Sequence, residues 1–166
     1  MNIRPLGEPG DLGWVVGEHG RVYAEEFGWD VSFEALVAQI VADYANKHDP
    51  RREAAWIAEV DGERAGCVFC VAADDTTAQL RILLVHPRAR GLGLGDRLVS
   101  GCLDFATAAG YRRMVLWTND VLAAARRIYQ RHGFALVDEE AHHSFGRDLT
   151  GQHWARDLGQ YADDMA

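Results

Sequence analysis

Apolar residues in the first third of the chain recur at helical spacing. Residues 11–27 place them near one face of a helix, and Gly28 supplies the stop signal. A second amphipathic segment follows, with Ser32 as its expected N-cap and Asp49-Pro50 at its end. Residues 3–6 could form a short first strand before both segments. The pattern predicts one strand followed by two helices.

The middle of the chain changes to strand-like patterning. Residues 54–60, 64–73 and 79–85 are apolar segments, and Asp61-Gly62 between the first two is a hairpin dipeptide. The polar run at residues 74–77 is a second turn. Three strands in series with short turns predict an antiparallel meander.

The second half alternates between the two patterns. Helices are expected over residues 93–109 and 121–132, and strands over residues 113–118, 134–137 and, more weakly, 150–158. A strand–helix–strand–helix–strand order predicts partly parallel pairing with helices packed on the sheet. We therefore expect an α/β fold with a mixed sheet: a single domain over residues 1–160, with a frayed tail at residues 161–166.

Composition narrows the class of protein. The chain has 166 residues, of which 48% are hydrophobic and 25% charged, and its net charge is −8. That charge disfavours nucleic acid and anionic membranes as partners, because both need a cationic face. An amine-bearing substrate fits better. The N-terminus carries no apolar signal region, so a cytoplasmic, bacterial-type location is expected.

Cysteine usage does not indicate a metal or redox site. The three cysteines include the C-x-x-C pair Cys67 and Cys70. This pair falls within a predicted strand, where residues three apart face opposite sides. Buried thiols in a strand are the better interpretation.

The most informative segment is the glycine-rich loop that follows the third meander strand. Arg90-Gly91-Leu92-Gly93-Leu94-Gly95 lies between that strand and a helix start, where free N–H groups and the helix dipole favour an anion. Four arginines (Arg81, Arg88, Arg90 and Arg97) surround it, which suggests a polyphosphate. The spacing is not the dinucleotide fingerprint, and a Walker A lysine is missing. A tight packing turn is the alternative.

Two motifs resemble the GNAT superfamily of N-acetyltransferases. One is Arg90-x-x-Gly93-x-Gly95 after a strand ending in Val85-x-Pro87, and the other is Tyr129-x-x-x-Gly133-Phe134. The resemblance covers essentially the whole chain. It implies an antiparallel meander, a parallel pair splayed at the cofactor site and helices on both faces. It also implies acetyl-CoA as co-substrate, with no metal.

Three segments resemble more closely the GNAT domain that is often fused behind a MarR-type winged-helix repressor. They are residues 26–30, 117–122 and 142–146. The length leaves no room for that DNA-binding half, so a GNAT domain alone is expected.

The resemblance also implies roles for individual residues. The backbone of Leu83, Leu84 and Val85 would pair with the pantetheine arm, and an N–H near Leu83 would stabilise the oxyanion. The pyrophosphate would be held by Arg90, Gly91, Leu92, Gly93, Leu94, Gly95 and Asp96. Tyr129 matches the general acid, although it could instead pack its ring on the sheet. Asn119 matches a pantetheine contact or is only a turn residue.

The general base and the substrate residues are less well defined. Gln79 and Arg81 occupy the positions where the family often carries its base. His142 and His143, expected on the connection between the last strands, are the substitutes; they could equally be exposed loop histidines, and a water chain would need neither. Glu26, Phe27 and Trp29, next to Glu25 and Asp30, could hold a cationic amine or form a plain hydrophobic staple.

The function implied is transfer of an acetyl group from acetyl-CoA to a primary amine of a small molecule, by direct attack in a ternary complex. Two alternatives stay open: a catalytically silent acyl-CoA-binding sensor or partner module, and a protein N-acetyltransferase, which would need a shallow groove. The fold would also allow a homodimer through the C-terminal strands.

Overall fold

A computed structural model describes residues 1–159, so the tail predicted at residues 161–166 lies outside the described residues. In chain order the elements are β1 (Asn2–Pro5), α1 (Asp11–Phe27), α2 (Val31–Lys47), β2 (Ala54–Val60), β3 (Glu63–Ala72), β4 (Thr77–Val85), η1 (Pro87–Ala89), α3 (Leu94–Ala108), β5 (Arg113–Asn119), α4 (Ala123–Arg131), β6 (Ala135–Ser144) and β7 (Arg147–Asp157).

The strands form one seven-stranded mixed sheet in the order β1-β2-β3-β4-β5-β7-β6. Every neighbouring pair is antiparallel except β4 and β5, which are parallel. Asp61 and Gly62 both have positive φ, 54° and 79°, as a tight hairpin turn requires. The meander, the parallel pair and the α/β class predicted from the sequence are confirmed.

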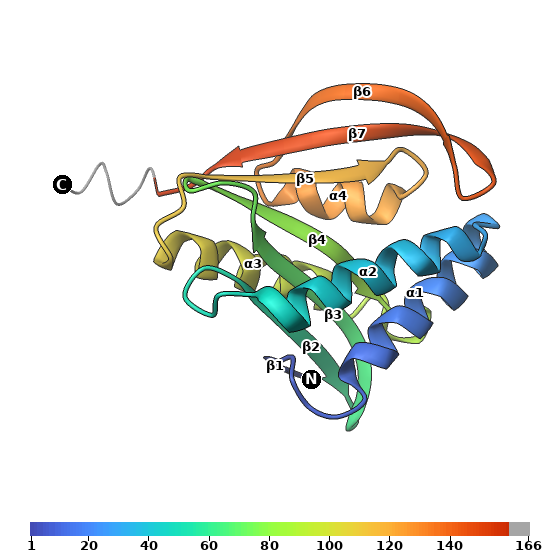
Figure 1. The fold of residues 1–166 in the computed structure, drawn as a ribbon, viewed down its shortest axis with the longest axis horizontal. Helices are drawn as coiled ribbons and strands as arrows, with labels where there is room; N and C mark the ends of the chain where they lie inside the picture. Colours follow the sequence, from blue (N-terminus) through green and yellow to red (C-terminus); the bar gives the residue numbers. More distant parts are fainter. Residues whose placement is uncertain (160–166) are drawn as a thin grey trace.

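The parallel pair β4–β5 separates part of the way along its length. Residues Thr77 to Leu80 pair with β5, but β4 continues to Val85 without that partner. A bulge at Ile82, whose φ is 43°, accompanies the separation and shifts the register against β3. Figure 1 shows the two strands starting together and diverging. The expected splay is present, and it leaves the edge of β4 after Leu80 without a strand partner.

Helices cover both faces of the sheet, as expected. One buried cluster joins α3 and the end of α4 to the sheet, and the other joins α1 and α2 to the opposite face. Cys70 belongs to the first cluster and Cys67 to the second, so the two thiols do face opposite sides. All three cysteines are free and buried.

Some element boundaries predicted from the sequence are wrong. The N-cap of α2 is Asp30 rather than Ser32, because the Asp30 carboxylate accepts the Ser32 backbone N–H at 3.0 Å. The strand expected at residues 134–137 extends to Ser144, and β7 begins at Arg147. The backbone ladder with β7 holds the acidic residues 138–140 in an exposed edge strand that has no apolar alternation. His142 and His143 therefore lie on β6 and not on a connection.

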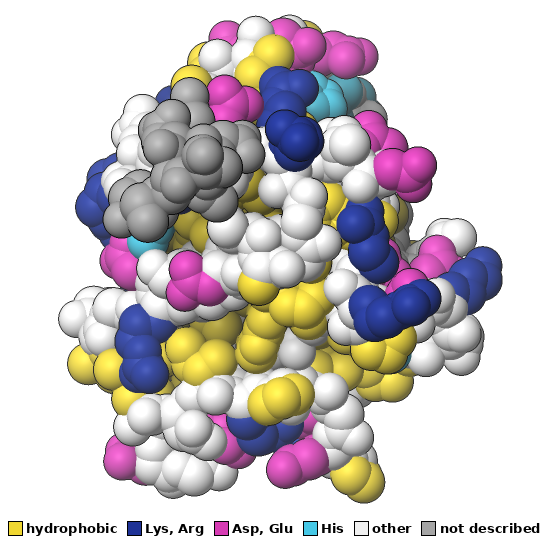
Figure 2. Space-filling view, turned by 90° about the vertical axis from the view of Figure 1, so that its left-hand side faces the viewer, with side chains coloured by type: hydrophobic (Ala, Val, Ile, Leu, Met, Phe, Trp, Pro, Cys, Tyr) yellow, Lys and Arg dark blue, Asp and Glu magenta, His cyan; other side chains and the backbone are white. Residues whose placement is uncertain are grey.

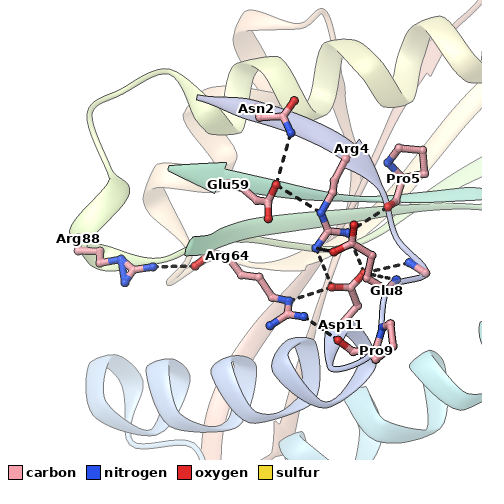
Figure 3. A network of polar contacts seen from close by, with 10 residues as sticks. Asn2, Arg4, Pro5, Glu8, Pro9, Asp11, Glu59, Arg64 and Arg88 are labelled. Atoms are coloured by element: carbon pink, nitrogen blue, oxygen red, sulfur yellow. Dashed lines mark hydrogen bonds and ion pairs between the residues drawn. The ribbon is translucent and has the colours of Figure 1, made fainter. Parts of the chain in front are cut away.

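A polar network fixes the start of α1 on the sheet (Figure 3). The buried Asp11 carboxylate accepts hydrogen bonds from Arg4 at 2.9 Å and from Arg64 at 2.8 Å. It also accepts the backbone N–H groups of Gly7 and Glu8, both at 2.9 Å. The Arg4 hydrogen bonds, above all, hold the pKa of Asp11 well below its usual range. This anchor ties α1 to β1 and β3 and so sets where the far end of α1 lies.

The surface gives no sign of a large charged patch on the face that Figure 2 shows. Basic and acidic side chains are interspersed there around apolar groups. Within residues 1–159 no helix is long and apolar enough to cross a membrane.

Candidate active site

A cleft of about 780 Å³ opens between the end of β4, the glycine-rich loop, α4 and the end of α1. Most of the predicted cofactor residues line it: Leu83, Leu84, Val85, Arg90, Gly91, Gly93, Leu94, Gly95 and Asp96. Leu92 is not among the lining residues and is 49% exposed. Asn119 lines a different pocket.

The loop backbone is shaped to receive an anion. Gly91 and Gly93 have φ of 82° and 79°, and a Cβ added to either would meet no atom within 4 Å. The conformation favours glycine, and the space above the backbone is open. Gly93 caps α3, and the first backbone bond of that helix runs from Arg97 N–H to the Gly93 carbonyl at 3.1 Å. The N–H groups of residues 94–96 therefore have no helical partner, which suits a pyrophosphate.

Gly95 also has a packing role. A Cβ there would lie 2.5 Å from Cδ1 of Ile128. Because Gly95 has no side chain, α4 can pack directly on the first turn of α3. This contact makes α4 one wall of the cleft.

The cations of the cleft come from two elements. Arg90 lies on the loop and forms a 2.7 Å ion pair with Glu26, and Arg131 of α4 forms a 2.9 Å ion pair with Asp96. Hydrogen bonding to Arg131 keeps the pKa of Asp96 below its ordinary value. Arg127, one helical turn before Arg131, also lines the cleft.

Arg127 and Arg131 were not among the cofactor residues predicted from the sequence. Their spacing of four positions on an amphipathic helix is the signal that could have indicated them. Of the four arginines singled out near the loop, only Arg90 lines this cleft. The Arg88 guanidinium turns away to Glu63 and to the Arg64 carbonyl.

The acidic loop expected to bind a cationic substrate is already paired. Glu26 and Phe27 line the cleft, with Glu26 held by Arg90, while Glu25 pairs with Arg21 and Asp30 caps α2. Trp29 is only 4% exposed and packs against Phe33 and Phe145, with ring centroids 4.8 and 4.9 Å away. These acids do not form a free anionic face.

A second pocket, of about 130 Å³, adjoins the cleft. The two share four lining residues, namely Tyr23, Leu83, Leu122 and Ala125. Tyr129 and Asn119 line the second pocket, as do Gln79 and Arg81. Of the predicted site residues, Leu83 lines both cavities, whereas Tyr129 and Asn119 line the second pocket alone.

Two tyrosines line the second pocket: Tyr129, which is buried, and Tyr23, which is half-buried and also lines the cleft. Tyr129 is 5% exposed, and burial raises its pKa well above the ordinary value. Burial likewise raises the pKa of Tyr23. Each side chain is therefore protonated at neutral pH. Tyr23 lay within an amphipathic helical pattern, so the sequence predicted only a core position for it.

The structure separates the two histidine candidates. His142 Nε2 lies 2.8 Å from Asn119 Oδ1, and His142 Nδ1 lies 2.9 Å from the Ser144 hydroxyl. Because the amide oxygen accepts, this assignment puts the proton on Nε2 and leaves Nδ1 to accept from Ser144. His143 is 68% exposed and its Nδ1 lies 2.8 Å from Asp148. His142 thus reaches the wall of the second pocket, and His143 does not.

Among the described residues, no group of three or more His, Cys, Asp or Glu side chains is placed to hold a metal ion.

The sequence matches known proteins over most of its length. Residues 20–134 match the acetyltransferase (GNAT) family. An uncharacterized N-acetyltransferase of Schizosaccharomyces pombe is 31% identical over 122 residues, which is 72% of this chain and 74% of that protein. The N-acetylaspartate synthetase of Homo sapiens is 34% identical over 89 residues, 53% of this chain but only 30% of its own length.

Solved structures share the fold at low sequence identity. A putative acetyltransferase from Salmonella typhimurium, solved with its cofactor acetyl-CoA, has a TM-score of 0.72 at 22% identity and covers 95% of this chain and 94% of its own. A ribosomal-protein-alanine N-acetyltransferase from Brucella melitensis has a TM-score of 0.76 at 17% identity, covering 95% and 100%.

Proposed function

The chain belongs to the acetyltransferase (GNAT) family and is an acetyl-CoA-dependent N-acetyltransferase, and from this premise we propose that its acceptor is a primary amine of a small molecule. The amine would attack acetyl-CoA directly while both are bound. The observation that carries the proposal is the meeting of the large cleft with the small second pocket at Leu83. That arrangement gives each of two substrates its own compartment and one point of contact.

The residues of the cleft fit the proposed co-substrate. Acetyl-CoA would supply an activated acetyl group as a thioester. The free N–H groups at the start of α3 would hold the pyrophosphate, with Arg90, Arg127 and Arg131 nearby. The unpaired edge of β4 from Leu83 to Val85 would receive the pantetheine arm, because its backbone groups lack a strand partner on the β5 side.

At the junction, the protein's own groups support each step of transfer. As the amine nitrogen bonds to the carbonyl carbon, the Leu83 N–H would stabilise negative charge on the carbonyl oxygen. As the carbon–sulfur bond breaks, Tyr129 would give its proton to the departing thiolate. The amine loses one proton in the same sequence. We assign its removal to Nδ1 of His142, through the Ser144 hydroxyl and intervening water, because Nε2 already carries the proton that it donates to Asn119.

The second pocket distinguishes this proposal from the two alternatives. A protein N-acetyltransferase would need a shallow groove, whereas the second pocket is small and aromatic rings line much of it. A silent acyl-CoA-binding module would keep the cleft but would not need the acceptor pocket or its buried phenol. Both observations favour a small-molecule enzyme.

We further propose that residues 1–160 form a single domain and that this domain is most similar to the GNAT domains fused to MarR-type regulators. We also propose a cytoplasmic location, which would suit three free thiols. A homodimer would use the open edge of β6, where Leu136 and Val137 are 44% and 57% exposed.

Thermal unfolding with added ligands tests the cofactor part of this proposal. A ligand at about 100 times its dissociation constant adds roughly 2.7 kcal/mol to the free energy of unfolding. For a domain of this size that corresponds to a shift of about 5–11 °C. We expect the shift with acetyl-CoA and with CoA but not with NADH. No shift at saturating acetyl-CoA, in folded protein, would overturn the proposal.

A further inference from the structure

Among the described residues, Arg81 is the only formally charged one that lines the second pocket. Neither Asp nor Glu is among the lining residues of this pocket, and the walls are mainly aromatic and aliphatic. Arg81 is half-buried, and among residues 1–159 its side chain has no hydrogen-bond or ion-pair partner. The nearest acidic influence is Asp43 on α2, which lies beyond ion-pair distance and outside the pocket lining.

The Arg81 guanidinium has no side-chain partner within the described part of the chain, but it is only partly withdrawn from solvent. Its partial burial lowers the pKa of Arg81. At neutral pH the group nevertheless remains a cation with donors in a planar fork. A carboxylate is the ligand group that matches this fork in both charge and geometry.

A second group lining the pocket also lacks a partner. His19 Nδ1 lies 2.7 Å from the Val15 carbonyl, which can only accept, so Nδ1 carries the ring proton. Nε2 is then an acceptor, and it is buried without a hydrogen bond within the described chain. Burial lowers the pKa of His19 to about 4, so the ring stays neutral at pH 7. The described residues that line the pocket therefore include one cation without a partner and one neutral ring whose buried acceptor has none.

The remaining walls set the size and polarity of the ligand. Trp29, Phe33 and Phe145 form a triangle of rings whose centroids lie 4.8 to 5.1 Å apart. The pocket volume of about 130 Å³ is close to the ~150 Å³ of an engineered cavity that accepts one benzene ring. A compact aliphatic or single-ring side chain fits. A second cationic group would find no carboxylate among the lining residues.

The position of Arg81 relative to Leu83 sets the length of the ligand. The two residues are two positions apart on β4, with the Ile82 bulge between them, so their Cα atoms lie at most about 7 Å apart. A ligand whose amine lies at Leu83 can therefore reach Arg81 with an anionic group only a few atoms from its nitrogen. An α-amino acid meets that condition, because one carbon atom separates its amine nitrogen from its carboxylate carbon.

We infer that the acceptor amine is an α-amino acid with a compact apolar side chain, and that Arg81 binds its carboxylate and determines specificity. This inference rests on the proposed acetyl transfer. The expected cationic acceptor is replaced by a zwitterion, whose carboxylate faces Arg81.

Matched acceptors test the inference. The panel is leucine and phenylalanine, the primary amide of each, and the decarboxylated amine of each, with CoA release and N-acetyl product as readouts. Wild-type protein should favour the free acids. Arg81→Gln should lower kcat/KM for the acids roughly 10- to 100-fold, mainly through KM, because a hydrogen-bonded charge is lost. Rates with the amides and amines should change less than about threefold.

The controls separate loss of binding from loss of fold. Arg113→Gln removes an exposed arginine on the neighbouring strand β5 that lines neither cavity. This variant should keep the preference for free acids over amides and amines. The shift in unfolding temperature with CoA should survive in Arg81→Gln. Equal use of acids, amides and amines by the wild type, or an unchanged preference in Arg81→Gln, would overturn the carboxylate assignment alone. No N-acetyl product with any amine would overturn the proposed function itself.

Discussion

The carboxylate of Glu26 lies 2.7 Å from the guanidinium of Arg90. This ion pair joins the end of α1 to the glycine-rich loop, and both side chains line the large cleft. A residue expected from the sequence to hold a cationic substrate is thus engaged with an arginine near the proposed pyrophosphate site. We therefore expect Glu26 to affect the affinity for CoA and not the binding of the amine.

Substitution Glu26→Gln distinguishes the two roles of this residue. Releasing Arg90 and removing a negative charge should strengthen CoA binding by up to about fivefold, the equivalent of ~1 kcal/mol for an exposed ion pair. The amine KM should stay within about twofold. Isothermal titration calorimetry measures the first and initial rates the second. Glu25→Gln, which removes only the pair with Arg21, is the matched control. A tenfold rise in amine KM would instead place Glu26 in the acceptor site.

Tyr129→Phe removes only the phenolic oxygen from the second pocket. If Tyr129 is the general acid, kcat should fall by about 100-fold or more. Because burial raises the pKa of Tyr129, the phenol stays protonated through the working range, and the wild-type rate should show no alkaline decline from this group below about pH 10. Initial rates against pH, with CoA affinity as the check on folding, give the answer. A rate within twofold of the wild type would assign Tyr129 to packing.

The two histidines on β6 should respond differently to alanine substitution. His142 contacts Asn119 in the pocket wall, whereas His143 pairs with Asp148 at the surface. We expect His142→Ala to lower kcat roughly 10- to 100-fold and His143→Ala to leave it within about twofold. Steady-state kinetics on both variants decides between them. The reverse order of effects would place the proton acceptor on the exposed side of β6.

Much of the fold could be predicted because its signals are local. The positive φ of Asp61 and Gly62 follows from their hairpin dipeptide, and the αL conformation of Gly28 at the end of α1 follows from its position after a periodic run. The length of β6 could not be predicted in this way. Its residues are held by backbone pairing with β7, which leaves no mark on an exposed, acidic edge strand.

The candidate site also has residues that local motifs predict and residues that only the fold brings into contact. The glycine-rich loop and Tyr129 were found because short motifs carry them. The pairing of Glu26 with Arg90 and the isolation of Arg81 depend on how α1, β4 and the loop meet in space. Residue spacing in the sequence does not show whether a charged side chain has an ion-pair partner. The Glu26–Arg90 pair and the unpaired Arg81 side chain therefore could not be predicted without the structure.

Asp11 should prove important for stability although it lies outside the cleft. Asp11→Asn removes the charge that Arg4 and Arg64 share, which should cost about 3 kcal/mol. That corresponds to a fall of roughly 6–12 °C in Tm at pH 7. Glu63→Gln, which removes an exposed pair with Arg88, should change Tm by no more than about 2 °C.

The pH dependence of this loss has a defined sign. The folded-state pKa of Asp11 is depressed, so its contribution is present above the unfolded value of about 3.9 and is lost as pH falls below it. The Tm difference between the wild type and Asp11→Asn should therefore narrow below about pH 4. Calorimetric scans from pH 7 to pH 3 measure it. A constant difference would mean that Asp11 acts through packing and not through its charge.

The most direct test of the central claim is the stoichiometry of acetyl transfer. The protein is incubated with acetyl-CoA labelled in its acetyl group and with the amine panel, and released CoA and N-acetylated product are quantified by mass spectrometry. We predict one N-acetyl amide for each CoA released, with the label in the amide. Binding of acetyl-CoA without any labelled amide would contradict the account and would identify the chain as a silent acyl-CoA-binding module.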